Sequence, residues 1–80
     1  MTLQTFMQRF PGWTAAEHWA RAEIIGEEYA RREYRLASWL AAGGGDSATY
    51  DDMALTCNAL GWAQERHFEA SRALRTGDRK

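Results

Sequence analysis

The chain has 80 residues, of which 45% are hydrophobic and 26% are charged, and its formal net charge is −1. This length allows a single domain with a small core, and the hydrophobic fraction is that of a folded chain rather than a disordered one. The near-neutral charge excludes a general electrostatic attraction to nucleic acid.

The cellular location is predicted from what the sequence lacks. Its only cysteine, Cys57, excludes an internal disulfide and favours a reducing compartment. No apolar run approaches the roughly 18 residues of a membrane span, and no basic segment followed by an apolar run opens the chain. We therefore expect a cytoplasmic protein without a membrane segment.

The first predicted helix covers residues 2–10. Its apolar residues have the i, i+3, i+4, i+7 spacing of one helix face and are Leu3, Phe6, Met7 and Phe10. Thr2 can serve as the N-cap, and Pro11-Gly12 ends the helix because proline disfavours helical geometry at the preceding residue. A helix this short is unstable alone, so we expect it to pack on the rest of the chain.

The longest helical pattern runs over residues 14–42. Thr14 and Glu17 match a capping box, and three consecutive glycines at 43–45 provide the stop. Gly26 lies mid-helix, where we expect a neighbouring backbone to approach closely. Glu33 is expected to form a hydrogen bond with a Tyr or Arg or to lie at the solvent-exposed end of the apolar stripe. The alternative is that it is a functional acid. The apolar stripe of this helix consists of Trp19, Ala22, Ile25, Gly26, Tyr29, Leu36, Ala37 and Leu40.

A flexible link at residues 43–48 precedes a helix predicted over 50–75. Thr49 is its expected N-cap, Asp51 and Asp52 lie near the positive end of its dipole, and Gly77 is its expected C-cap. The predicted inward stripe is Met53, Cys57, Leu60, Ala63, His67, Ala70 and Leu74. A second apolar stripe needs another partner, either the first helix or another molecule, and consists of Leu55, Ala59 and Trp62.

These patterns predict an all-α fold with one domain over residues 1–80. Helices 14–42 and 50–75 would form an antiparallel hairpin, and the 2–10 helix would pack across it to complete a three-helix bundle. Because so small a chain buries little apolar surface and carries a second apolar stripe, a homodimer is compatible with the sequence.

No catalytic or metal-binding constellation is recognisable. His18 and His67 are the only histidines, and neither has a second ligand type three or four residues further along. The two could meet across helices, but a packed or surface histidine is the simpler interpretation. Cys57 is expected to be a small buried residue, about 15 Å along the helix from His67. We therefore expect no enzyme activity, catalytic residue, cofactor or metal.

One short similarity links the two long helices. Gly12-Trp13 precedes His18-Trp19 at the same spacing at which Gly61-Trp62 precedes His67-Phe68. Two matches of this length do not indicate a repeat fold, and we interpret them as coincidence.

The charges are unevenly distributed along the chain. Residues 43–65 contain four acidic residues and no basic one, whereas residues 66–80 contain five basic residues and two acidic ones. Basic residues gather at Arg31, Arg32 and Arg35 and at Arg72, Arg75, Arg79 and Lys80, but acids dilute both groups. A helix-turn-helix reader needs an exposed basic helix start, whereas this helix starts with acids. Direct binding of nucleic acid is therefore the weaker alternative.

An aromatic and acidic surface is the candidate binding site. Aromatic side chains with an acidic rim would suit a basic protein groove, such as one that holds nucleic acid. The alternative is that Asp51 and Asp52 only complete the helix start. The candidate partner-binding residues are Trp39, Asp46, Tyr50, Asp51, Asp52 and, in a second apolar patch, Trp62.

In its size, Arg- and Ala-rich composition, helical pattern and aromatic-acidic segment from Trp39 to Asp52, the chain resembles the small phage-encoded anti-CRISPR proteins. These proteins share no sequence motif, so the resemblance is one of type and transfers no site residue. It implies an inhibitor in the bacterial host cytoplasm that binds a type I CRISPR effector complex and hinders target DNA binding. The alternatives are a self-associating structural or regulatory protein and a nucleic-acid-binding regulator that uses the Arg patches.

Overall fold

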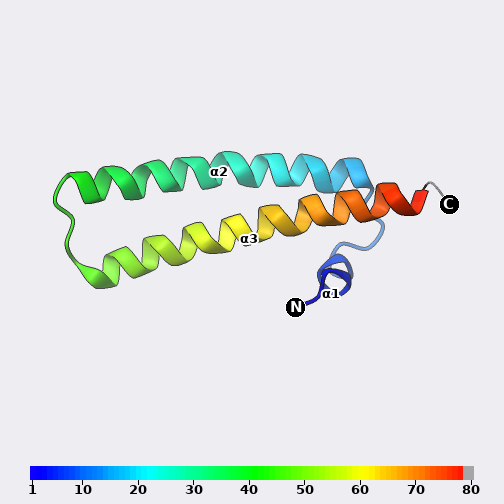
Figure 1. Ribbon diagram of the computed structural model, residues 1–80, viewed down its shortest axis with the longest axis horizontal. Helices are drawn as coiled ribbons and strands as arrows, with labels where there is room; N and C mark the ends of the chain where they lie inside the picture. The colour runs from blue at the N-terminus through cyan, green and yellow to red at the C-terminus, as the bar shows by residue number, and fades with distance from the viewer. Residues whose placement is uncertain (79–80) are drawn as a thin grey trace.

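The computed structural model describes residues 1–78, with side chains through Thr76, and that part of the chain forms helices without strands. Helix α1 spans Leu3–Met7, α2 spans Ala15–Ala41 and α3 spans Ser47–Asp78. Figure 1 shows α2 and α3 side by side as a long antiparallel hairpin, with α1 against α3 in the half of the hairpin opposite the connecting loop. The predicted all-α class and three-helix arrangement are confirmed.

The helix starts follow from side-chain caps. Thr2 accepts a hydrogen bond from the Thr5 backbone N–H at 3.1 Å. At the start of α2, Thr14 accepts from the Glu17 N–H at 3.1 Å while the Glu17 carboxylate accepts from the Thr14 N–H at 2.9 Å, which is the predicted capping box. For α3, the cap is Asp46 rather than Thr49, because the Asp46 carboxylate accepts from the Thr49 N–H at 3.2 Å.

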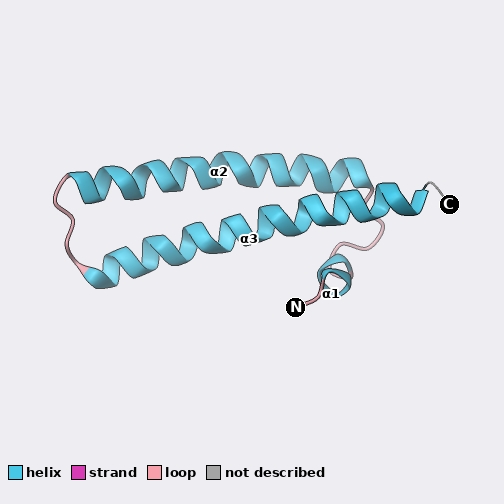
Figure 2. Cartoon of the chain, viewed as in Figure 1, coloured by secondary structure: helices cyan, strands magenta, loops and turns pink. Residues whose placement is uncertain are grey.

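Other helix ends also differ from the prediction. Helix α1 stops at Met7 instead of residue 10, and the chain then turns through i→i+3 hydrogen bonds, such as the Phe10 N–H to the Met7 carbonyl at 3.0 Å. Helix α3 starts three residues earlier than expected and continues through Gly77, which is therefore not a C-cap. The basic residues Arg79 and Lys80 lie outside the described residues. Figure 2 shows that the connections between helices are short.

The contact between α2 and α3 follows a heptad pattern, with steps of three and four residues on each helix. The predicted α3 stripe largely coincides with it, but the predicted α2 stripe is shifted, since Trp19 and Leu40 lie beside the seam and are 38% and 46% exposed. The seam residues are all buried or half-buried: His18, Ala22, Ile25, Tyr29, Arg32, Leu36 and Trp39 on α2, and Met53, Cys57, Leu60, Gln64, His67, Ser71 and Leu74 on α3.

Two glycines make room for large side chains of the opposite helix. A Cβ on Gly26 would lie 2.4 Å from Nε2 of Gln64, and a Cβ on Gly61 would lie 3.1 Å from the ring of Tyr29. The structure therefore corrects the expectation that a neighbouring backbone approaches Gly26, because a side chain fills that space instead. Glycine has a poor helix propensity, but at these two positions the missing side chain allows Gln64 and Tyr29 to pack in the seam.

The hairpin is thin and has a small core. Its dimensions are 54 × 21 × 15 Å and its radius of gyration is 15.8 Å, whereas a compact domain of 80 residues has about 12 Å. The exposed surface is 5628 Å², compared with about 4,900 Å² for a compact monomer of 9.1 kDa. Within residues 1–76 the buried apolar residues are Phe6, Ala22, Cys57 and Ala70, and the buried polar residues are His18, His67 and Ser71.

Candidate functional site

The predicted partner-binding residues do not form one surface. Those from Trp39 to Asp52 lie at the loop end of the hairpin, where α2 stops and α3 begins. Trp62 lies ten residues beyond Asp52 on α3, roughly 15 Å along the helix axis, with its ring 5.7 Å from that of Phe6 in α1. The second apolar stripe is thus partly covered by the first helix, which is one of the two partners expected for it. Leu55 on the same stripe is exposed.

Two of the loop-end residues have structural roles. Asp46 caps α3, and hydrogen bonds from the Thr49 hydroxyl and N–H lower the pKa of its carboxyl. Trp39 is half-buried under the loop, since a Cβ on Gly44 would lie 2.3 Å from its ring. The Gly44 N–H also donates to the Trp39 carbonyl at 2.9 Å, and Gly43 has a positive φ of 94° that favours glycine. Trp39 and Asp46 therefore hold the hairpin end in shape.

The side chains left free at this end are Tyr50, Asp51 and Asp52. Tyr50 is 42% exposed, and both aspartates are exposed. Because Asp51 and Asp52 are adjacent on a helix, they diverge by about 100°. We define these three residues as the loop-end surface. The sequence already predicts this divergence from helix geometry, and the three residues lie at the start of α3.

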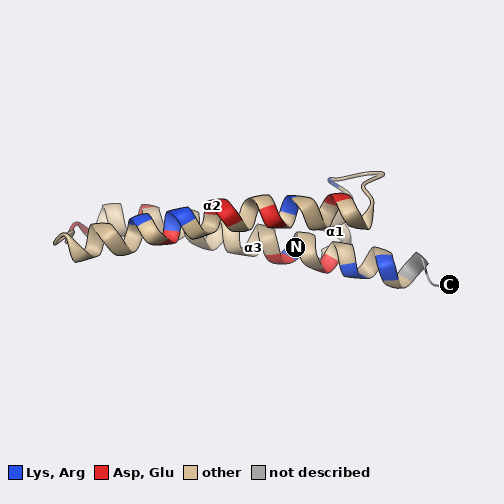
Figure 3. Ribbon diagram, turned by 90° about the horizontal axis from the view of Figure 1, so that it is seen from above, with Lys and Arg blue, Asp and Glu red and all other residues tan. Residues whose placement is uncertain are grey.

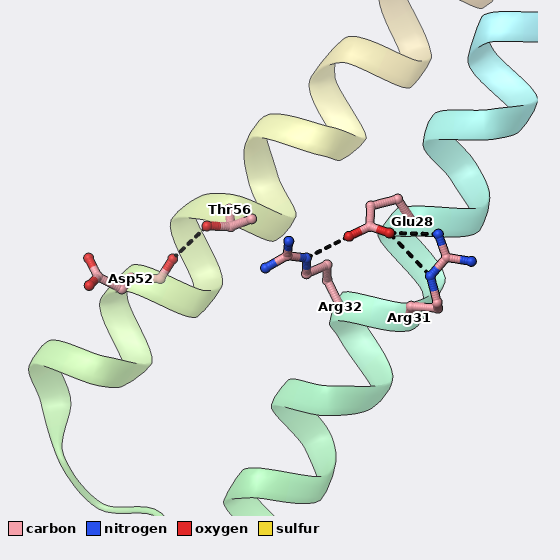
Figure 4. A network of polar contacts seen from close by, with 5 residues as sticks. All are labelled: Glu28, Arg31, Arg32, Asp52 and Thr56. Carbon is pink, nitrogen blue, oxygen red and sulfur yellow. Dashed lines mark hydrogen bonds and ion pairs between the residues drawn. The ribbon is translucent and has the colours of Figure 1, made fainter.

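Asp52 lies beside arginines from α2. A cleft of about 260 Å³ is lined by Arg32, Arg35, Asp52, Met53 and Thr56. Figure 4 shows Arg32 reaching from α2 toward α3, with its Nε 2.8 Å from the Glu28 carboxylate. Glu28 also binds Arg31 at 2.6 Å, and its hydrogen bonds to Arg32 and Arg31 lower the pKa of its carboxyl. On this side of the hairpin, the acid of α3 is thus faced by bases of α2.

Tyr50 lines a cleft on the other side. This cleft has a volume of about 370 Å³, and most of its lining residues are apolar or small. Its one carboxylate is the exposed Glu33, which raises the pKa of the Tyr29 hydroxyl by hydrogen bonding and by its charge. This agrees with the expected structural role of Glu33 beside a tyrosine. The lining residues are Tyr29, Glu33, Leu36, Ala37, Leu40, Tyr50, Ala54, Cys57 and Asn58.

A second notable feature is a buried histidine pair near the opposite end of the hairpin. Nδ1 of His18 lies 2.9 Å from Nδ1 of His67, and the two residues are only 1% and 3% exposed. The sequence allows the two histidines to meet across helices, and the structure shows that both are packed rather than at the surface. Phe6, Phe10 and Trp13 enclose the pair, with the rings of Phe6 and Phe10 each 4.8 Å from that of His67. The N-terminal segment therefore serves as the cover of this pair.

Burial keeps both imidazoles neutral. Desolvation, followed by the charges of His18 and Arg21, lowers the pKa of His67 to about 4, and desolvation also lowers the pKa of His18. In a neutral pair one Nδ1 donates its proton and the other accepts, so a single proton joins the rings. The residues that follow the two histidines also meet, since the ring of Trp19 packs on that of Phe68 at 4.6 Å.

The remaining chemistry of the described residues is sparse. Within residues 1–78, no group of three His, Cys, Asp or Glu residues is placed to hold a metal ion. Cys57 is buried in the seam, as expected for a small hydrophobic residue. None of the helices in this range combines the length and the apolar character needed to cross a membrane.

Comparisons with known proteins give no relative from which a role could be transferred. The chain matches no protein-family model, no curated protein and no solved structure. Functional inference therefore rests on the residues themselves.

Proposed function

We propose that this protein acts by binding another protein through the loop-end surface. The observation that carries the proposal is the exposure of Tyr50, Asp51 and Asp52 at one end of the hairpin. The cap of Asp46 and the packing of Trp39 under the loop hold that end in a defined shape, which lowers the entropy lost on binding. A tyrosine beside acids fits a basic protein surface. The tyrosine ring can be buried as a binding hot spot, and the acids attract the basic partner during association.

The proposed partner is a basic groove that holds nucleic acid, and the resemblance of type points to a type I CRISPR effector complex. In this role the protein is a non-enzymatic inhibitor that hinders target DNA binding in the bacterial host cytoplasm. Local contact suits this chain better than mimicry of DNA over the whole surface, because its net charge is only −1. Figure 3 supports the same choice, since α2 carries both acidic and basic segments along its length instead of one acidic face.

Charge reversal at the loop end tests the proposal. The double variant Asp51→Lys with Asp52→Lys is compared with Glu23→Lys combined with Glu27→Lys, which changes the net charge equally on exposed positions of α2. Each protein is tagged and incubated with a purified type I effector complex, and the retained subunits and DNA binding by the complex are measured. Far-UV circular dichroism confirms that each variant keeps its helices.

We expect the wild type and the α2 variant to retain the effector subunits and to reduce DNA binding, and the loop-end variant to do neither. Undiminished binding by the folded loop-end variant would exclude this surface. Failure of the wild type to retain any effector subunit would exclude the type I complex as the partner.

A further inference from the structure

We propose that two copies of this chain pair through the face of the hairpin that α1 leaves uncovered, forming an antiparallel four-helix dimer. This open face is defined by residues that recur at heptad spacing beside the seam. On α2 they include Trp19 and Leu40, and on α3 they include Ala54 and Phe68. The loop end of this face includes Tyr50 and Asp51 of the loop-end surface, whereas Asp52 lies on the other side of the hairpin beside Arg32 and Arg35.

Contacts show that the two helices direct these residues to the same side. The rings of Trp19 and Phe68 touch at 4.6 Å near the chain termini. Nearer the loop, Leu40 and Ala54 line the same 370 Å³ cleft. Helix α1 lies elsewhere, because Phe6 packs on Trp62 and on the buried His67 instead. The open face is therefore continuous from one end of the hairpin to the other.

The exposed area favours a second copy as the occupant. The chain exposes 5628 Å², which is about 700 Å² more than a compact monomer of its mass. A standard protein interface buries about 800 Å² on each partner. A dimer through one face of the hairpin would therefore bring each chain close to the surface expected for a compact protein.

The charges on the open face favour the antiparallel arrangement. Toward the loop its charged residues are acids, Glu33 and Asp51. Toward the termini it carries Arg72 and Arg75 together with two acids at the same heptad positions, Glu23 and Glu65, and the Glu65 carboxylate lies 3.9 Å from Arg72. A two-fold axis near the middle of the hairpin keeps the two acidic loop halves apart and places each beside the arginines of the other copy, whereas a parallel pair would bring the two acidic halves together.

A matched pair of leucine substitutions tests the face. Leu40→Glu lies on the open face, whereas Leu55→Glu lies outside it, and both leucines are exposed in the single chain, at 46% and 69%. Sedimentation velocity over a concentration series gives the dimer dissociation constant. We expect the wild type and Leu55→Glu to dimerise and Leu40→Glu to weaken the dimer at least tenfold. Ala37→Glu, on an exposed position of the same cleft, should act like Leu40→Glu.

The orientation is tested with a spin label at Gly45→Cys, in a loop position where an added side chain meets no close neighbour and where the buried Cys57 does not compete for the label. We expect a distance between the two labels that approaches the 54 Å length of the hairpin. A label distance below half that length would overturn the antiparallel arrangement. A monomeric wild type, or a dimer that tolerates Leu40→Glu but not Leu55→Glu, would overturn the proposed face. Asp52 lies outside this face, beside Arg32 and Arg35, so the single variant Asp52→Lys separates a loss of partner binding from a loss of the dimer, whereas Asp51→Lys touches both surfaces.

Discussion

The histidine pair should make the stability of this protein fall with decreasing pH from about pH 6.5, before most carboxylates begin to titrate. The pKa of His67 is about 4 in the folded protein, compared with 6.5 for an unperturbed histidine. Between these values the unfolded state binds more protons than the folded state, so folding stability falls as the pH falls. The loss begins near pH 6.5 and is complete below pH 4.

The size of this effect follows from the shift. A difference of one pKa unit corresponds to 1.36 kcal/mol, so His67 alone accounts for about 3 kcal/mol at full protonation and about 2 kcal/mol between pH 7.5 and pH 5. His18, whose pKa is lowered by burial, adds to this loss. A domain of 80 residues has a total stability of roughly 4–12 kcal/mol, so the effect is a large fraction of it.

Urea unfolding followed by circular dichroism at pH 7.5 and pH 5, at one protein concentration, measures this loss. The control is the double variant His18→Phe with His67→Phe, which fills the aromatic cluster with rings that cannot be protonated. We expect the variant to lose little stability over the same interval, because Glu17, Glu28 and Asp46 have lowered pKa values and stay ionised at pH 5. A wild-type loss below about 0.5 kcal/mol would refute the assignment of a buried neutral pair.

Two further substitutions test the ends of the hairpin. Gly44→Ala should destabilise the protein by about 1–3 kcal/mol in urea unfolding, because its Cβ would meet the Trp39 ring at 2.3 Å. Gly45→Ala, which has no such neighbour, is the matched control, and equal effects of the two substitutions would contradict the packing of Trp39 under the loop. Phe6→Ala should cost up to about 3–5 kcal/mol and raise the pKa of His67 toward 6.5, because it opens the aromatic cover. The His67 pKa is measured by NMR titration, and an unchanged value would show that Phe6 does not exclude water from the pair.

Local signals predicted the helices and most of their caps. Thr14 and Glu17 form the capping box that their spacing indicates, and the inward stripe of α3 follows its apolar residues. The α2 stripe was misplaced because two seam positions are polar: His18 and Arg32 do not register in an apolar pattern. The apolar periodicity therefore predicted helix α2 correctly but placed its buried face at the wrong angle around the helix.

The candidate site was harder to predict because its geometry depends on contacts between distant residues. Trp39 is half-buried only because Gly44 lacks a side chain, and Trp62 meets Phe6 only because α1 folds back onto α3. The meeting of His18 with His67 depends on how α2 and α3 align along their length. No pattern within either helix specifies that alignment.

The seam positions differ in size and polarity along the hairpin, and this difference determines how α2 and α3 align. Sliding α3 by one heptad toward the loop would place Gln64 opposite Glu33 and away from the space that Gly26 provides. The same slide would set His67 opposite Ile25, leaving each imidazole without its hydrogen-bonding partner in a closed apolar space. A seam of leucines would tolerate such a slide, whereas one with polar and glycine positions penalises it. The observed alignment therefore gives the two buried imidazoles their hydrogen bond, and misaligned forms should be short-lived during folding.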